Sequence, residues 1–410
     1  MLALNAPGQL SYDSLTQLAD GRAGSYNSWH PPLMAFLLGV FDSLVTGTFL
    51  FLLFQSLLLL GGLLALLALK PRGWLSPAAA LAIVLTPQWL LFQGAIWKDI
   101  LFAAAAIAGF AALAWHAHRP HPARAILALA LLVLAVAMRQ NGIILLPVAA
   151  VSLAVTGPGR WKQGLALLAG GLVLLLGLGL ALAPKTDGGD GAVAQVRLAQ
   201  SYDMAGALAR DRELSLALPP DLNRLMRARG APLYNPLRND DFASDEPLNQ
   251  ARSQAGVGVI SGAWMALVTK HPLLYLSVRW DDFVAVVTTP DSQICHFVTT
   301  GVVNSPDLLR QLGFSTRNNA RDRALRDYAH LFFATPIYSH LVWGFLAIVL
   351  LVVLLRRRGP ADLVIAGLLA GALLFALSFF FISIACDYRY LFFLDISAMA
   401  AALYCIRRRA

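Results

Sequence analysis

Long apolar stretches separated by short polar connections make up most of this chain of 410 residues. A helix needs about 20 apolar residues to cross the hydrocarbon core of a bilayer. On that basis we predict nine crossings, at residues 47–69, 75–92, 100–115, 125–138, 142–156, 164–183, 336–355, 361–385 and a last one before the C-terminal arginines. Segments 125–138 and 142–156 are short enough to form a re-entrant hairpin instead. The pattern predicts an all-α polytopic membrane protein.

Composition and charge support this fold class and exclude two other classes. Hydrophobic residues make up 58% of the chain and charged residues only 13%, which excludes a soluble globular protein. The net charge of +9 does not indicate nucleic-acid binding, because residues 185–335 contain 16 Lys/Arg and 16 Asp/Glu and so carry no basic stripe. The excess positive charge lies in alternate connections, which the positive-inside rule places in the cytoplasm: Lys70, Arg72, Arg119, Arg124, Arg160, Lys162, Arg356, Arg357, Arg358, Arg407, Arg408 and Arg409.

The charge pattern divides the chain into four regions. We expect an outer juxtamembrane segment at 1–46, a transmembrane bundle at 47–183, an external and mostly helical segment at 184–335, and C-terminal transmembrane helices at 336–410. An odd number of crossings with the C-terminus inside places the N-terminus outside. We therefore expect a further transmembrane helix upstream of Met1, with direct export of a short tail as the alternative.

Turn-forming residues punctuate the external segment, and we predict short helices between them. These helices are expected at Val196–Leu208, Asp221–Arg229, Asn249–Leu267 and Pro306–Leu312. The stretch Leu273–Val287 is apolar enough to lie on the membrane surface or the bundle, where Trp280, Asp281 and Asp282 would border a cleft, or to form an ordinary core.

Cysteine and histidine spacing gives little support for a disulfide or a metal site. Cys295 and Cys386 both fall on the predicted outer side, where oxidation is permitted, but no framework spacing supports a pair. We expect both to be unpaired. His116, His118 and His121 imitate metal-ligand spacing, yet they have no acidic or thiol residue nearby, so we interpret this run as a basic solvated loop.

The remaining four basic residues of the membrane regions fall on the predicted outer face, each beside polar or aromatic residues. They are Arg22 within Asp13–His30, Lys98 in Trp97-Lys98-Asp99, Arg139 before Gln140-Asn141-Gly142, and Arg389 in Asp387-Tyr388-Arg389-Tyr390. Ionisable residues gathered at one membrane face indicate a functional site. The structural alternatives are that Asp13 is the N-cap of a helix over Ser11–Gly21, that Asp99 caps the span beginning at Ile100, and that the cations anchor the interface.

In their order and placement these residues resemble the GT-C-fold glycosyltransferases, which take a sugar from a polyprenyl-phosphate donor and include the protein mannosyltransferases and the lipid A aminoarabinose transferases. The resemblance rests on Asp13, the His30-Pro31-Pro32 element, Lys98-Asp99, Arg139-Gln140-Asn141-Gly142 and Arg389-Tyr390, and covers roughly 8–158 and 336–406. It implies a GT-C-like helical bundle with juxtamembrane helices in the first outer loop.

The resemblance also implies roles for these residues. Asp13 would be the catalytic base, and Asp99 would orient the acceptor or assist a metal. Lys98, Arg139 and Arg389, with His30, Tyr388 and Tyr390, would bind substrate, since cations stabilise charge on a leaving phosphate. A divalent metal ion is a candidate cofactor, although many relatives carry an acidic residue where this chain has Ser28-Trp29 before His30.

On this interpretation the protein is an enzyme of the bacterial inner membrane with its active site facing the periplasm. It would transfer a sugar to a hydroxyl of a glycan, lipid or protein acceptor. One alternative is an O-antigen polymerase or ligase, which uses a diphosphate-linked donor. A second is a secondary transporter, which predicts ionisable groups near mid-membrane and internal repeats; the sequence shows neither.

Overall fold

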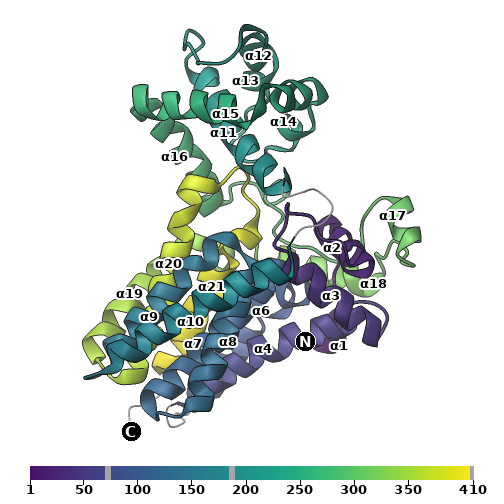
Figure 1. Ribbon diagram of the computed structural model, residues 1–410. Coiled ribbons are helices and arrows are strands. Elements are labelled where there is room, and N and C mark those ends of the chain that lie inside the picture. Colours follow the sequence, from purple (N-terminus) through teal and green to yellow (C-terminus); the bar gives the residue numbers. More distant parts are fainter. Residues whose placement is uncertain (70–74, 184–189, 407–410) are drawn as a thin grey trace.

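The computed structural model describes residues 1–69, 75–183 and 190–406, and every regular element in these ranges is a helix (Figure 1). Only isolated β-bridges pair extended segments there. Six helices are long and apolar enough to cross a membrane: α4 (Phe49–Ala68), α7 (Lys98–His118), α10 (Arg160–Ala181), α19 (His340–Arg357), α20 (Pro360–Ile382) and α21 (Phe392–Ile406) with the short helix η5 (Tyr388–Leu391) before it. The prediction of an all-helical protein is confirmed, and several of its helices are long and apolar enough to span a membrane.

Helix α7 forms the centre of the bundle. It packs against α4, α20, α21 and α8 (Pro122–Met138), and nearly all of its residues are buried. Its many alanines allow neighbouring helices to approach closely, as small residues do in membrane bundles. Gly62 of α4 shows how closely, because a Cβ atom added there would lie 2.9 Å from the backbone of Ala108.

In the described ranges six helices are long and apolar enough to cross a membrane, or up to eight if two bent pairs each form one span, so not every one of the nine predicted crossings corresponds to a long helix. The segment predicted to cross at 75–92 is divided into α5 (Leu75–Val84) and α6 (Pro87–Leu90), followed by η1 (Phe92–Gly94) and bent by 72°. Pro87 causes the break, because it cannot donate the backbone hydrogen bond and disfavours helical geometry at the residue before it.

The segment after α8 is also too short to count as a long span. Helix η2 (Gln140–Ile144) leads directly into α9 (Leu145–Ala154), and both α8 and the η2–α9 unit are shorter apolar helices. These two correspond to the predicted segments 125–138 and 142–156, whose short length already allowed a re-entrant hairpin.

The N-terminal segment contributes α1 (Leu2–Asn5), α2 (Tyr12–Ala23) and α3 (Pro32–Leu44) beside the bundle. Ser11, not Asp13, is the N-cap of α2, in a capping box with Ser14, and the helix runs through Gly21 to Gly24. Both the capping role of Asp13 and the helix end at Gly21 were therefore predicted wrongly. The Asp13 side chain is free to make the long-range contact described below.

A second layer of helices, here called the cap, stands above one end of the bundle (Figure 1). It consists of α11 (Asp190–Arg210), α12 (Pro220–Leu225), η3 (Met226–Gly230), α13 (Ala231–Leu233), α14 (Asp240–Ser244), α15 (Glu246–Lys270) and α16 (Pro272–Thr288), and has its own hydrophobic core. The helices α17 (Pro306–Gln311) and α18 (Ala320–His330), which lie beside α2 and α3 (Figure 1), and η4 (Pro336–Tyr338) complete the external segment. The four helices predicted there are confirmed, with shifts at their ends.

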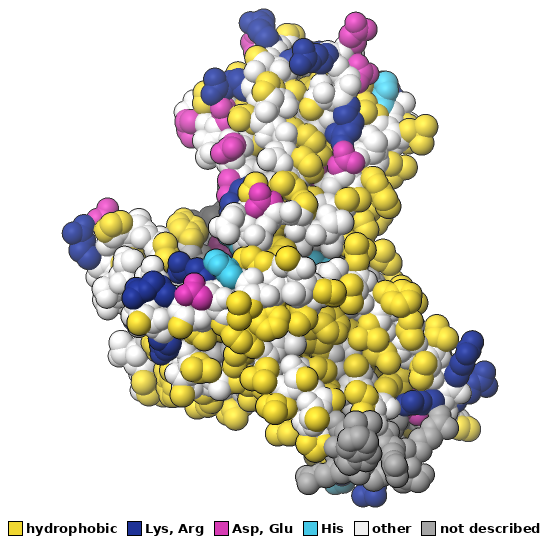
Figure 2. Space-filling view, turned by 180° about the vertical axis from the view of Figure 1, so that it is seen from behind, with side chains coloured by type: hydrophobic (Ala, Val, Ile, Leu, Met, Phe, Trp, Pro, Cys, Tyr) yellow, Lys and Arg dark blue, Asp and Glu magenta, His cyan; other side chains and the backbone are white. Residues whose placement is uncertain are grey.

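Helix α16 connects the cap to the bundle, since it packs against both α11 and α20. Both interpretations of Leu273–Val287 are thus partly correct: Val278 is buried in the cap core, whereas Trp280 is exposed. In Figure 2 charged side chains gather on the cap and in a band where it meets the bundle, and an apolar surface lies below that band. This distribution fits a bundle in lipid with the cap in water.

The link between α20 and η5 is attached to the external segment by a disulfide between Cys295 and Cys386, whose Cα atoms lie 4.9 Å apart. Our prediction that these cysteines are unpaired is wrong. The bond joins residues 91 positions apart, so no local spacing could show it. Backbone hydrogen bonds from Cys386 to Leu237 (3.0 Å) and from Tyr388 to Cys295 (2.7 Å) add to this attachment.

Candidate functional site

An ion pair between Asp13 and Arg389 lies at the centre of the candidate site. The Arg389 Nη1 atom is 2.8 Å from Asp13 Oδ2, although the residues are 376 positions apart. Arg389 also binds Asp387, with 3.0 Å between Nη2 and Oδ2, and its guanidinium lies over the indole of Trp97 at 4.8 Å. Helix α2 and the η5 turn, at opposite ends of the chain, thus contribute to one cluster.

Lys98 and His30 form the second contact of the site. Lys98 is the first residue of α7, and its Nζ atom donates to His30 Nδ1 at 3.0 Å. His30 comes from the connection between α2 and α3, directly before the two prolines that begin α3. This lysine therefore pairs with a neutral ring instead of a carboxylate.

Asp99 and Arg139 form the third contact, with 2.6 Å between Asp99 Oδ1 and Arg139 Nη1. Helix α7 begins at Lys98 after the N-cap Trp97, so the prediction that Asp99 caps this helix is wrong. The Arg139 guanidinium also lies over the Tyr390 ring at 5.5 Å. Arg139 Nε and Asp99 Oδ2 are buried without a hydrogen-bond partner, so this pair retains unused bonding capacity.

A cavity of about 270 Å³ borders this cluster through His30. Its wall includes both polar and apolar side chains: Ser28, His30, Pro31, Pro32, Val136, Ala137 and Gln140. Because α3 and α8 supply the apolar part and the connection before α3 supplies the polar part, the cavity suits a ligand with a charged head and an apolar tail.

The electrostatics of the site favour a charged Asp13 and a neutral His30. Burial raises the pKa of the Asp13 carboxyl, but the neighbouring positive charges, that of Arg389 foremost, together with the Arg389 hydrogen bond hold this pKa below its ordinary value of 3.8. Burial and the charge of Lys98 lower the pKa of His30 to about 3. Three cations thus face three carboxylates, while the ring beside Lys98 carries no charge at neutral pH.

The structure brings together most of the predicted site residues but separates Tyr388 from them. Asp13, His30, Lys98, Asp99, Arg139, Arg389 and Tyr390 meet in the contacts just described. Tyr388 is completely buried, and its hydroxyl donates to Asp395 at 2.6 Å. That burial is incompatible with substrate binding by Tyr388, so the expected role of this residue is withdrawn.

Two side chains of the cluster were missed as site residues by the sequence reasoning. Asp387 accepts from Arg389, and Trp97 lies beneath the same guanidinium. Both were present in the motifs that drew attention to Lys98 and Arg389, so their position beside the predicted cations was the available signal. Sequence alone could not show that they contact Arg389.

The carboxylates of the site do not fit a divalent metal ion. Asp13 and Asp99 each face an arginine, and in the described ranges no group of three or more His, Cys, Asp or Glu side chains is arranged to hold one. Outside the site, His116 of the histidine run at 116–121 contacts the side chain of Gln163, with 3.1 Å between Nε2 and Oε1. A guanidinium occupies the place that a cation would take beside each acid, so the proposed reaction below uses no metal step.

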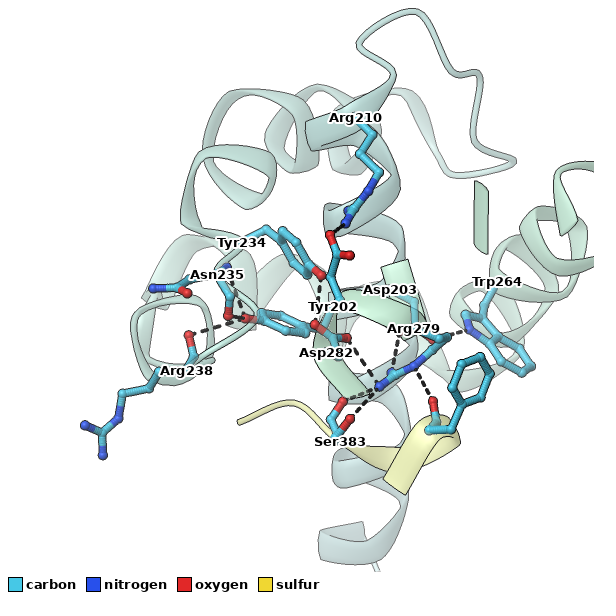
Figure 3. Close-up of polar contacts among 12 residues, drawn as sticks. Tyr202, Asp203, Arg210, Tyr234, Asn235, Arg238, Trp264, Arg279, Asp282 and Ser383 are labelled. Atoms are coloured by element: carbon cyan, nitrogen blue, oxygen red, sulfur yellow. Dashed lines mark hydrogen bonds and ion pairs between the residues drawn. The ribbon is translucent and has the colours of Figure 1, made fainter. Parts of the chain in front are cut away.

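A second charged cluster, centred on Arg279 of α16, joins the cap to the end of α20 (Figure 3). Arg279 is completely buried, and its Nη1 atom is 2.7 Å from Asp203 Oδ1 and its Nη2 atom 3.3 Å from Asp282 Oδ2. It also donates to the carbonyl groups of Phe380 and Ser383 at the end of α20. This cluster fastens two parts of the molecule, and its guanidinium is held by protein acceptors on several sides.

Comparisons with protein-family models, with curated proteins and with solved structures found no match to this chain. The resemblance to the GT-C glycosyltransferases therefore remains a prediction from the motifs. What the structure adds is the grouping of these motifs at one end of the bundle.

Proposed function

We propose that the protein is a membrane glycosyltransferase that transfers a sugar from a polyprenyl-phosphate donor to an acceptor hydroxyl at the outer face of the cytoplasmic membrane. The observation that carries this proposal is the meeting of Asp13, Lys98 and Arg389 in one cluster beside an amphipathic cavity. A carboxylate next to cations at a lipid boundary offers both chemical groups that the transfer needs.

In the proposed reaction, the oxygen of the acceptor hydroxyl attacks the anomeric carbon of the donor sugar. The bond between that carbon and the phosphate oxygen breaks, and the hydroxyl proton passes to the Asp13 carboxylate. Polyprenyl phosphate leaves with the electron pair of the broken bond. Because Asp13 is a weak base, its proton transfer would occur late, when the attacking oxygen has become strongly acidic.

Lys98, Arg389 and Arg139 would stabilise the leaving phosphate. Negative charge builds on the phosphate oxygens as the bond breaks, and cations held in a partly buried site stabilise such charge better than they do in water. Lys98 is the best placed of the three, because its hydrogen-bond partner is the neutral ring of His30 and not a carboxylate. Asp99 and Asp13 act on Lys98 only through their charge, so a phosphate would displace no hydrogen-bonded carboxylate at this position.

The mixed wall of the cavity supports a lipid-linked donor. Pro31, Pro32, Val136 and Ala137 can contact an apolar chain, while His30 and Gln140 can contact its polar head. This composition favours a polyprenyl carrier at the membrane boundary.

The test is to identify the lipid product. The purified chain in lipid nanodiscs is incubated with polyprenyl-phosphate sugars and polyprenyl-diphosphate sugars, and the released lipid is measured by mass spectrometry. The proposal expects polyprenyl phosphate as the product. Release of polyprenyl diphosphate would establish the polymerase or ligase alternative, and sugar movement across a vesicle membrane without bond cleavage would establish the transporter.

A further inference from the structure

A second cavity, of about 210 Å³, lies between the cap and the connection that carries His30. Its wall combines α11, α14 and α15 of the cap with one aromatic residue of the N-terminal segment: Trp29, Ala194, Arg197, Leu198, Ala243, Asn249, Arg252 and Ser253. Trp29 is 40% exposed, which is high for so large an apolar side chain. Neither the contacts nor the chemistry of the candidate site account for this pocket.

Arg252 is buried in the wall of this pocket without a carboxylate partner. Only 5% of the residue is exposed, and its guanidinium lies over the Phe242 ring at 4.7 Å. Its Nη2 atom donates to the side-chain oxygen of Asn249, whereas Nη1 has no hydrogen-bond partner. A buried charge without a counterion is costly, so an anion in the pocket would relieve a real deficit.

The nearest carboxylate does not satisfy this need. Asp245 binds Arg229, with 2.6 Å between Oδ2 and Nη2, and its Oδ1 atom accepts from the backbone N–H of Leu248 at the start of α15. Arg197 adds a second positive charge that acts on Arg252, and its side chain forms no ion pair with any residue of the described ranges. Two arginines that form no ion pair with a carboxylate of the described residues therefore line one small pocket.

The connection before α3 is a wall shared by this pocket and the cavity of the candidate site. Ser28 accepts from the Ala192 backbone N–H at 2.9 Å, and the Trp29 carbonyl accepts from Gln195, so α11 holds this connection in place. Trp29 borders the cap pocket, while Ser28 and His30 border the cavity beside Lys98. One extended substrate could occupy both sides of the connection.

We propose that the cap pocket binds the anionic group of a charged sugar, a carboxylate or a phosphate, in the substrate that reacts beside Lys98. Arg252 and Arg197 bind the anion, and the Trp29 ring contacts the sugar that carries it. Guanidinium groups suit carboxylate and phosphate oxygens because their donors are fixed in a planar fork. The part of this inference that concerns reaction rests on the proposed function, whereas binding in the pocket is independent of transfer.

Isothermal titration of the full chain in phosphatidylcholine nanodiscs tests the pocket directly. The probes are glucuronate, glucose 6-phosphate, inorganic phosphate and neutral glucose. The expected result is binding of at least one of the two charged sugars and no binding of glucose. Comparison of glucuronate with glucose 6-phosphate tells a carboxylate from a phosphate ligand. Binding of neither charged sugar would overturn the proposal.

Three variants assign any observed binding to this pocket. Arg252→Gln and Arg197→Gln should each weaken binding of the charged sugar by about tenfold or more, since each removes a charge-assisted hydrogen bond. Arg212→Gln, at an exposed cap position outside the pocket, should bind like the unchanged protein. Arg197 is only half-buried, so its variant remains informative if Arg252→Gln does not fold. Unchanged affinity in a folded Arg197 or Arg252 variant would place the anion elsewhere.

A further variant tests whether the pocket recognises the sugar as well as its charge. Trp29→Ala should weaken binding of the charged sugar while leaving that of inorganic phosphate unchanged; equal effects on both would overturn the sugar-binding role of Trp29. Because these titrations measure no product, a chain that binds the sugar but transfers none would contradict only the proposed function. A chain that transfers sugar without binding these probes would contradict only the pocket.

Discussion

The two arginine clusters at the ends of the link between α20 and α21 differ in what holds their cations. Arg279 is surrounded by fixed acceptors from Asp203, Asp282 and the end of α20, and has no exposed surface. The cluster around Arg389 includes Lys98, whose partner is a neutral ring, and borders a cavity. The contrast separates a cation that fastens the fold from cations that retain capacity for a ligand.

The sharpest way to test this comparison is Asp13→Asn. The change preserves shape but removes the proposed proton acceptor, so turnover should fall about 10²–10⁴-fold, the usual contribution of a general base. The free energy of unfolding should change little, because Arg389 keeps Asp387 as a counterion when Asp13 loses its charge. Lipid-product release and denaturant unfolding measure the two effects. Asp42→Asn is the matched control, since Asp42 pairs with Arg22 away from the site. Full turnover in Asp13→Asn would show that Asp13 takes no part in the mechanism.

Arg279→Met should lower the stability of the protein and leave turnover unchanged, which is the opposite of the effect expected for Asp13→Asn. It leaves Asp203 and Asp282 buried without their counterion, a change that typically lowers the free energy of unfolding by about 3–5 kcal/mol. Folded protein should still transfer sugar, because Arg279 is no part of the site. Arg210→Met, which breaks the more exposed pair with Asp281, is the control and should cost much less. A stable but inactive Arg279 variant would contradict the division between the clusters.

Sequence patterns alone predicted the all-helical fold class and the presence of several helices that are long and apolar enough to span a membrane. Apolar stretches of spanning length and basic connections are local features, so they can be recognised before folding is known. The disulfide could not be recognised in this way, because Cys295 and Cys386 become neighbours only when the external segment folds back onto the link after α20. The bend within the predicted crossing at 75–92 was missed for a different reason: Pro87 interrupts a stretch that is mostly apolar.

The residues that form the site were easier to predict from the sequence than the contacts between them. The motifs identified Asp13, Lys98 and Arg389, but nothing in them indicated that Asp13 meets Arg389 while Lys98 meets His30. Tyr388 shows the limit most clearly. In a 3₁₀ turn successive side chains point about 120° apart, so Arg389 reaches the site while the neighbouring Tyr388 points to Asp395.

Removing the disulfide should have an intermediate effect, because the bond fastens the link that leads to Arg389. The double variant Cys295→Ala/Cys386→Ala should lose about 2–4 kcal/mol of unfolding free energy, the usual contribution of a disulfide that closes a long loop. Turnover should also decrease, since Arg389 loses one of its supports. Cys405→Ala, at the far end of α21, serves as the control for loss of a cysteine. Thermal unfolding with and without reductant measures the difference, and equal stability of the two variants would show that the bond has no structural role.

The smallest expected effect concerns the neutral state of His30. Its pKa in the folded protein is lowered to about 3, whereas an ordinary histidine has 6.5. As the pH falls below about 6.5, the unfolded chain takes up a proton at this position and the folded chain does not, so unfolding becomes easier. One such group contributes at most about 1.4 kcal/mol per pH unit.

His30→Gln removes this contribution, and the free energy of unfolding of the variant should therefore depend less steeply on pH between about 6.5 and 4.5. Asp13 does not interfere, because its lowered pKa places its own titration below this window. Other histidines, such as His296, cancel in the comparison with the unchanged protein. Denaturant unfolding at a series of pH values measures the two slopes. Equal slopes would mean that His30 takes up a proton beside Lys98 in the folded protein. The contrast between Lys98, whose partner is a neutral ring, and Arg279, whose partners are carboxylates and carbonyl groups, would then fail.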